Sequence, residues 1–220
     1  ESTWSVYEGH TRNHFKEFDK IKINRITTAR VEKFIRNRQT EGMHILTLRK
    51  ILVSLGQIFS YSVRHKYIDY NPLSDAERPK DQGQVKEQGI KILTPDEINA
   101  FLDAVSDQKY KILFRLAIFS GARQGEIIGL KWSDVDWIFS QIHIQRTFNN
   151  QAWYDVKTRT SNRKIDLGPI MMTELKKWKL ACPKNKLDLI FPNEAEQPMN
   201  NTNMLYRYFD PTLKKAGIKK

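Results

Sequence analysis

The chain has 220 residues, of which 40% are hydrophobic, and no apolar run is long enough to span a membrane. This size suits one large or two small globular domains. The single cysteine, Cys182, excludes an internal disulfide and fits a reducing cytoplasm, and the polar opening without a Met indicates a trimmed fragment with no signal peptide. The net charge of +12 favours a polyanionic partner, chiefly through the release of counterions from phosphates.

Residues 1–80 are predicted to form helices only. Apolar side chains recur at helical spacing over 5–18, 27–35 and 47–67, and Thr27 is a suitable N-cap for the second segment. Asn71-Pro72 is expected to end the third helix. The apolar stripe of that helix consists of Leu48, Ile51, Leu52, Leu55, Ile58, Phe59 and Val63.

A polar, weakly basic face lies opposite this stripe. Its members follow one another at steps of three or four residues and are Lys50, Ser54, Gln57 and Tyr61. Such a face fits the major groove of duplex DNA, with Arg49 and Lys50 on phosphates, and Arg12 of the first helix is a further candidate for DNA contact. An ordinary solvated helix face explains the same pattern, and the residues alone leave both interpretations open.

A polar stretch over 81–91 is predicted to be an interdomain linker, followed by a second domain over 92–220. Thr94, Pro95 and Glu97 form a capping box with proline at the first helical position. Expected helices lie near 95–106, 109–119, 170–181 and 201–216, and expected strands lie at 141–147, 153–156 and 163–167, with a turn at Asn149-Asn150. The second domain is therefore predicted to be mixed α+β, with a small three-stranded antiparallel sheet.

One arginine, Arg123, falls on a glycine-flanked bend directly after the apolar run 112–119. Glu126 follows one helical turn later, where its carboxylate can hold the guanidinium. A guanidinium fixed in this way suits phosphate oxygens, because its planar fork donates two parallel hydrogen bonds. A structural Arg–Glu pair between two helices is the alternative.

The bend belongs to the pattern G-x-R-x-G-E-I-x-x-L-x-W-x-D-V-D over residues 121–136. This pattern resembles the first-arginine box of the tyrosine recombinases, the phage-integrase family. The resemblance implies a helical, SAM-like core-binding domain over 1–80, and over 92–220 a catalytic domain truncated at its C-terminus. It implies cleavage and rejoining of double-stranded DNA through a phosphotyrosyl intermediate, in the service of site-specific recombination or integration.

The resemblance also assigns roles to residues. Arg123 would bind the scissile phosphate with Glu126 in support, and Lys157, in a basic hairpin, would protonate the leaving group, with Arg159 as its competitor. Arg159 and Arg163 would contact DNA. No residue of the sequence is expected to belong to the family's His-x-x-Arg pair or to be its tyrosine nucleophile. The C-terminal tyrosines, Tyr206 and Tyr208, lie in a predicted helix and are expected to pack or to form hydrogen bonds. The chain is therefore expected to bind DNA without cutting it.

Other chemistry has weaker support. His10 and His14 have the spacing of a zinc-protease helix but lack its Glu, and Asp134 with Asp136 lacks the further acidic residues of a two-metal site. Neither a metal nor another cofactor is expected. The intact enzyme would form tetramers on DNA, and this chain is expected to be monomeric, without membrane contact. A non-catalytic DNA-binding protein or a truncated recombinase relic is the alternative function.

Overall fold

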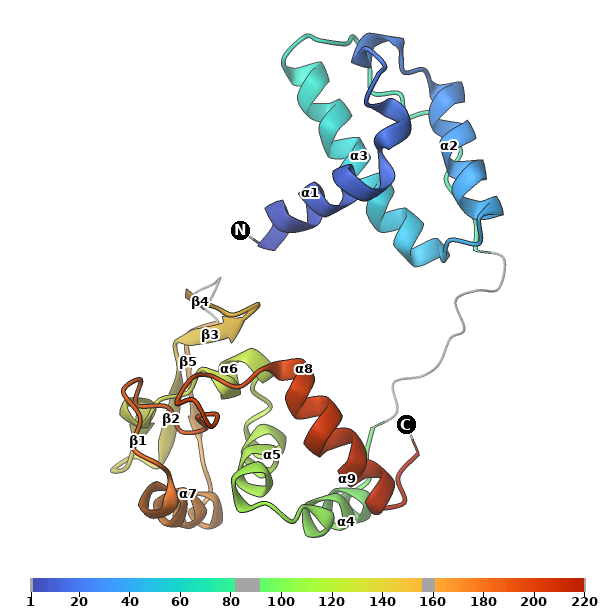
Figure 1. Cartoon of the computed structure of the whole chain (residues 1–220). Helices are drawn as coiled ribbons and strands as arrows, with labels where there is room; N and C mark the ends of the chain where they lie inside the picture. The colour runs from blue at the N-terminus through green and yellow to red at the C-terminus, as the bar shows by residue number, and fades with distance from the viewer. Residues whose placement is uncertain (1, 82–91, 156–160, 220) are drawn as a thin grey trace. The chain divides into compact units, whose positions relative to one another are not determined.

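The computed structural model describes residues 2–81, 92–155 and 161–219 (Figure 1). The chain separates into two compact units, 1–89 and 90–220, and each has a hydrophobic core of its own. The boundary between the units falls inside the predicted linker 81–91, of which only Asp81 is described. None of the described helices is both long enough and apolar enough to cross a membrane.

All regular secondary structure in the described residues of the first unit is helical. Its elements are α1 (Ser2–His14), α2 (Thr28–Thr40) and α3 (Ile45–Arg64), with short 3₁₀ turns at Lys16–Phe18 and Ile23–Arg25. The side chain of Thr27 accepts a hydrogen bond from the backbone N–H of Arg30, which confirms it as the N-cap of α2. The predicted stripe of α3 packs against Phe15, Phe18 and Phe34, although Ile58 at its edge is 38% exposed.

The polar face predicted on α3 is interrupted at Ser54. This residue is only 3% exposed, and its hydroxyl lies 2.7 Å from Nδ1 of His10 on α1. The prediction of an exposed Ser54 was wrong because α1 packs against α3 at this residue. A small residue at this position lets the two helices approach closely.

The end of α3 also differs from the prediction. The helix ends at Arg64, and Lys66 then adopts a left-handed conformation with φ of 59°. Asn71 lies beyond the helix in the following loop, where its side-chain oxygen accepts a hydrogen bond from the N–H of Leu73. The Asn71-Pro72 pair therefore shapes this loop and does not terminate the helix.

The second unit combines helices with two small sheets. Its helices are α4 (Pro95–Ala104), α5 (Gln108–Ser120), α6 (Gln124–Ile128) and α7 (Pro169–Ala181), followed by a C-terminal helix made of α8 (Asn201–Met204), a π-helical turn (Leu205–Phe209) and α9 (Asp210–Lys215). The capping box predicted at Thr94 and Glu97 is present. Pro211 explains the wide turn, because it has no N–H to donate to the carbonyl of Arg207.

The strands pair differently from the prediction. β1 (Val135–Asp136), β2 (Gln141–Ile144) and β5 (Arg163–Asp166) form a three-stranded antiparallel sheet in the order β1-β2-β5. β3 (Arg146–Asn149) and β4 (Ala152–Asp155) form a separate antiparallel hairpin. The predicted turn is present between them, with positive φ at Asn150 and Gln151.

The predicted single strand 141–147 breaks at Gln145. In a straight strand, consecutive side chains point to opposite faces. Here the neighbouring side chains of Gln145 and Arg146 both bond to the carboxylate of Asp134. The backbone must turn to satisfy both contacts, and this turn diverts the chain from the sheet of β2 into the hairpin.

Candidate active site

The arginine bend begins where α5 ends. Gly121 has φ of 58°, a left-handed conformation that stops the helix. The hydroxyl of Ser120 accepts a hydrogen bond from the N–H of Ala122, at 3.2 Å, and thereby supports the reversal. Arg123 is then the N-cap residue of α6. Its side chain is 73% exposed and therefore accessible to a ligand.

Glu126 is the buried centre of the bend. Its side chain is 3% exposed and accepts two hydrogen bonds from Arg123, one from the backbone N–H at 2.8 Å and one from Nη1 at 3.0 Å. The same carboxylate receives Arg163 of β5 at both oxygens, with Nη2 to Oε2 at 2.9 Å and Nη1 to Oε1 at 3.3 Å. One buried carboxylate therefore holds two guanidinium groups, from α6 and from β5.

The ionisation of Glu126 follows from these contacts. Burial by itself raises the pKa of this carboxyl, but the hydrogen bonds from Arg163 and Arg123 outweigh burial and bring the pKa below its ordinary value. The group is charged at neutral pH, and the cluster of two arginines and one glutamate keeps one net positive charge. Because Arg123 is the exposed member, this charge is presented to solvent.

Two glycines bring the β3–β4 hairpin against α6. A Cβ atom on Gly125 would lie 2.5 Å from Oγ1 of Thr147 and 2.7 Å from the carbonyl oxygen of Phe148. A Cβ on Gly129 would lie 3.2 Å from the ring of Trp153. The glycine that follows Arg123 by two residues is therefore needed for the close approach of hairpin and helix.

The last part of the pattern builds a second buried carboxylate. Asp134, with 1% of its side chain exposed, accepts hydrogen bonds from the N–H of Lys131, from Gln145 and from Arg146. Asp136 instead accepts from the backbone N–H groups of two residues in the β1–β2 turn. Both aspartates serve the protein's own structure, and the described residues contain no group of three His, Cys, Asp or Glu that could hold a metal ion.

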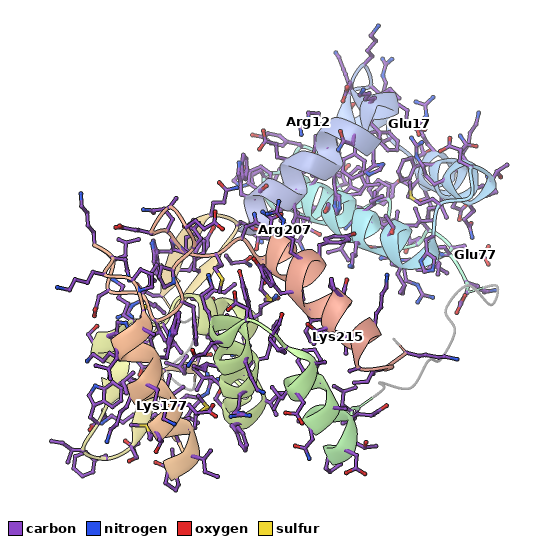
Figure 2. All side chains as sticks on the ribbon, turned by 60° about the horizontal axis from the view of Figure 1, so that its bottom comes forward. Arg12, Glu17, Glu77, Lys177, Arg207 and Lys215 are labelled. Carbon is purple, nitrogen blue, oxygen red and sulfur yellow. The ribbon has the colours of Figure 1, made fainter. Side chains whose placement is uncertain are left out.

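The remaining predicted residues are distributed over both units. Lys157 and Arg159 lie outside the described residues. Arg163 was predicted to contact DNA, but its guanidinium is engaged with Glu126. In the first unit, the side chains of Arg12 (Figure 2), Arg49, Lys50, Gln57 and Tyr61 are exposed.

The two C-terminal tyrosines differ from each other. Tyr208 stacks on Tyr110 with ring centroids 3.4 Å apart, which confirms the expected packing role. Tyr206 is 72% exposed, so for this residue the expectation of packing was wrong. The period of the helix places Tyr206 and Arg207 on its outer side, where Arg207 projects from the surface (Figure 2).

Sequence reasoning missed two contacts near the bend. Arg163 carries no local signal of its pairing with Glu126, which lies 37 residues away. Gln124, next to Arg123, receives a hydrogen bond from Asn201 at the start of α8. Both contacts join segments that are distant in the sequence, so only the fold reveals them.

The bend thus presents one exposed guanidinium, Arg123, which a buried carboxylate orients. The Phage integrase family profile matches residues 91–220. The chain belongs to this family, the tyrosine recombinases.

Two curated relatives illustrate the match. A protein of Caldanaerobacter subterraneus subsp. tengcongensis, described as tyrosine recombinase XerC-like, is 28% identical over 246 residues, which cover 99% of this chain and 63% of the relative. The ICEBs1 integrase of Bacillus subtilis is 24% identical over 185 residues, covering 80% of this chain and 48% of the relative. The chain thus spans between about half and two thirds of the length of these relatives.

Solved structures share the fold. The Tn1549 transposon integrase in complex with transposon right end DNA aligns with a TM-score of 0.78 and 19% identity, covering 97% of this chain and 72% of that one. A lambda integrase tetramer bound to a Holliday junction aligns with a TM-score of 0.69 and 18% identity, covering 100% of this chain and 59% of that one. At these identities the likeness concerns the fold.

Proposed function

We propose that this chain is the core of a site-specific recombinase that cleaves and rejoins duplex DNA, as in the integration of a phage or mobile element. Residues 1–80 would be the core-binding domain, 81–91 the linker and 92–220 the N-terminal part of the catalytic domain. The observation that carries the proposal is the position of Arg123. Its guanidinium is 73% exposed, while the carboxylate that orients it is buried and held from the other side by Arg163.

The chemistry assigned to Arg123 is electrostatic. A tyrosine oxygen attacks the phosphorus, a 3′-phosphotyrosyl bond forms, and the bond to the 5′-oxygen breaks. Negative charge grows on the non-bridging oxygens during this step, and a pre-oriented guanidinium stabilises that charge without having to reorganise. The departing 5′-oxygen needs a proton, which we assign to Lys157, with Arg159 as the competing donor.

The first unit would hold the duplex. The exposed side chains of Arg12, Arg49, Lys50, Gln57 and Tyr61 support this role, since they combine cations for phosphates with groups that can reach bases. Ser54 is withdrawn from the proposed contact surface because it is buried under α1. The relatives bound to DNA in solved structures make duplex DNA the natural partner to test.

We further propose that residues 1–220 do not cleave DNA by themselves. Tyr208 is occupied by its stacking on Tyr110, and the groove that Tyr206 lines is formed by the C-terminal segment alone, by residues 206–219. Without further residues the chain would be a cytoplasmic monomer, whereas the complete enzyme would assemble as a tetramer on paired DNA sites, as lambda integrase does on a Holliday junction.

A nicked duplex that traps covalent intermediates tests these assignments. Residues 1–220 should bind the duplex with an affinity that falls steeply as salt rises, and should form no covalent adduct. In the full-length gene product, Arg123→Ala should lower the cleavage rate by on the order of 10²- to 10³-fold, the usual cost of losing one preorganised donor to the transition state. Cleavage at the wild-type rate by Arg123→Ala would remove Arg123 from the active site.

A further inference from the structure

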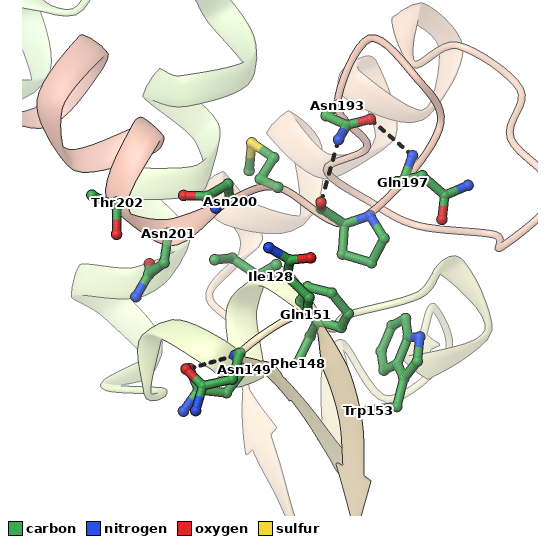
Figure 3. A pocket seen from close by; sticks show the side chains of 13 residues that line it. Ile128, Phe148, Asn149, Gln151, Trp153, Asn193, Gln197, Asn200, Asn201 and Thr202 are labelled. Carbon is green, nitrogen blue, oxygen red and sulfur yellow. Dashed lines mark hydrogen bonds between the residues drawn. The ribbon is translucent and has the colours of Figure 1, made fainter. Parts of the chain in front are cut away.

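A pocket rich in amide side chains lies beside the arginine bend. It has a volume of about 870 Å³ and is lined on one side by the hairpin turn at 148–153 and on the other by the segment 193–202 that leads into α8 (Figure 3). None of the described residues that line it carries an ionisable side chain. The amide residues of its lining are Asn149, Asn150, Gln151, Asn193, Gln197, Asn200 and Asn201.

Some of these amides are engaged by the protein itself. The side-chain oxygen of Asn193 accepts hydrogen bonds from two backbone N–H groups, and that of Asn200 caps α8. The side chains of Asn150, Gln151 and Gln197 are exposed. In Figure 3, Gln151 lies between the hairpin and Asn200. The exposed amides are therefore placed to bind a ligand from both walls of the pocket.

One atom of the lining is a buried acceptor without a donor. Asn201 donates through Nδ2 to Oε1 of Gln124, at 2.5 Å, whereas its Oδ1 is buried and has no hydrogen-bond partner among the described residues. A buried polar atom of this kind carries a free-energy cost that a bound donor removes. Because this oxygen is closed to solvent, the exposed amides of the lining are the groups that a ligand can contact.

The chemistry of the lining favours a base over a phosphate. A phosphate needs cations or clustered N–H donors, and the ionisable residues that would supply cations are absent from the described lining. Side-chain amides offer a donor and an acceptor together, which is the pattern that Asn and Gln use to bind N6 and N7 of adenine. Phe148 and Trp153 add aromatic surface on the hairpin wall.

We propose that this pocket reads base edges of the DNA next to the phosphate held by Arg123. The inference rests on the proposed function and adds the residues that determine sequence specificity. Through Asn201 and Gln124, the pocket is connected to the residue that directly follows Arg123. A base bound in the pocket would thus lie close to the phosphate bound by Arg123. Recognition of that base would determine which phosphate of the DNA is cleaved.

Selection from a pool of randomised duplexes, with residues 1–220 as the binding protein, tests the inference. The main variant is Asn150→Gly with Gln151→Gly, because both residues have positive φ, which glycine adopts without strain while removing the amide. Gln197→Ala tests the opposite wall. Gln108→Ala removes an exposed amide at the start of α5, outside the pocket, and serves as the matched control.

The measured quantity is the ratio of dissociation constants between the selected duplex and duplexes with one base pair changed. We expect the pocket variants to lower this ratio by roughly tenfold at one or two positions, with an unchanged dependence on salt and an unchanged melting temperature. The Gln108→Ala variant should keep the wild-type ratio.

Two results would overturn the inference. Wild-type selectivity in all pocket variants would show that the amides do not read bases, as would a wild-type chain that selects no preferred duplex. Either result leaves salt-dependent DNA binding intact. If the wild-type chain shows no salt-dependent binding to any duplex, the proposed function fails as well, so the two failures are distinguishable.

Discussion

The two buried carboxylates of the second unit, Glu126 and Asp134, both form ion pairs with arginine, but only Glu126 holds an arginine that is exposed to solvent. Each is almost completely buried and each forms an ion pair with arginine. The partner of Asp134 is Arg146, whose side chain is 24% exposed. Glu126 holds Arg163, which is 29% exposed, and Arg123, which is 73% exposed.

The difference shows how one motif yields both a scaffold and a ligand site. At Asp134 every contact is internal: the pair fixes the break between β2 and β3. At Glu126 the internal contact is made by Arg163, so Arg123 can be oriented without being buried. An exposed arginine contributes little to stability. Its fixed orientation then serves a ligand.

The largest effect on stability is expected for Asp134→Ala. This change leaves Arg146 partly buried without its partner and removes the acceptor for Gln145 and for the N–H of Lys131. We expect the free energy of unfolding to fall by about 3 to 5 kcal/mol, the usual cost of breaking a buried ion pair. Urea denaturation measures the effect. Asp136→Ala, which loses only turn contacts, is the matched control and should cost about 1 kcal/mol.

A smaller loss is expected for Arg163→Ala. Glu126 keeps its contacts to Arg123 but loses its bidentate partner, and its carboxylate stays buried. The free energy of unfolding should fall by about 2 kcal/mol, in line with hydrogen bonds to a charged group. Arg163→Lys should recover only part of the loss, because an ammonium cannot bind both oxygens in the same plane. Full stability in Arg163→Ala would contradict the internal role given to this residue.

The comparison also explains which features the sequence could predict. Thr27, Thr94 and the Arg123–Glu126 pair depend on contacts within a few residues, and each is present in the structure as expected. The break at Gln145 depends on Asp134, eleven residues earlier, and neither a glycine nor a proline marks it in the sequence. Ser54 depends on His10, 44 residues away. Patterns within one helix or strand could be predicted, while contacts between elements could not.

The ionisation of Glu126 makes the stability of the fold depend on pH. The folded-state pKa of Glu126 lies below its ordinary value, so the ionised carboxylate stabilises the fold above the unfolded-state pKa, and this contribution is lost as the pH falls towards the folded-state pKa. Thermal unfolding followed at mildly to strongly acidic pH should show this loss. In Arg163→Ala the folded-state pKa of Glu126 should rise, because its main lowering contact is gone and burial remains, so the loss of stability on acidification should become smaller. In Glu126→Gln this part of the pH dependence should disappear.

The most direct test compares Arg123→Ala with Arg146→Ala in residues 1–220, for stability and for DNA binding as a function of salt. Arg123→Ala should change the free energy of unfolding by less than about 0.5 kcal/mol and reduce the slope of log affinity against log salt by about one, as expected for one lost phosphate contact. Arg146→Ala should lower stability by about 2 kcal/mol and keep the wild-type slope. An Arg123→Ala protein that is destabilised like Arg146→Ala and keeps the full salt slope would show that Arg123 is structural, and would contradict its role as the phosphate-binding residue.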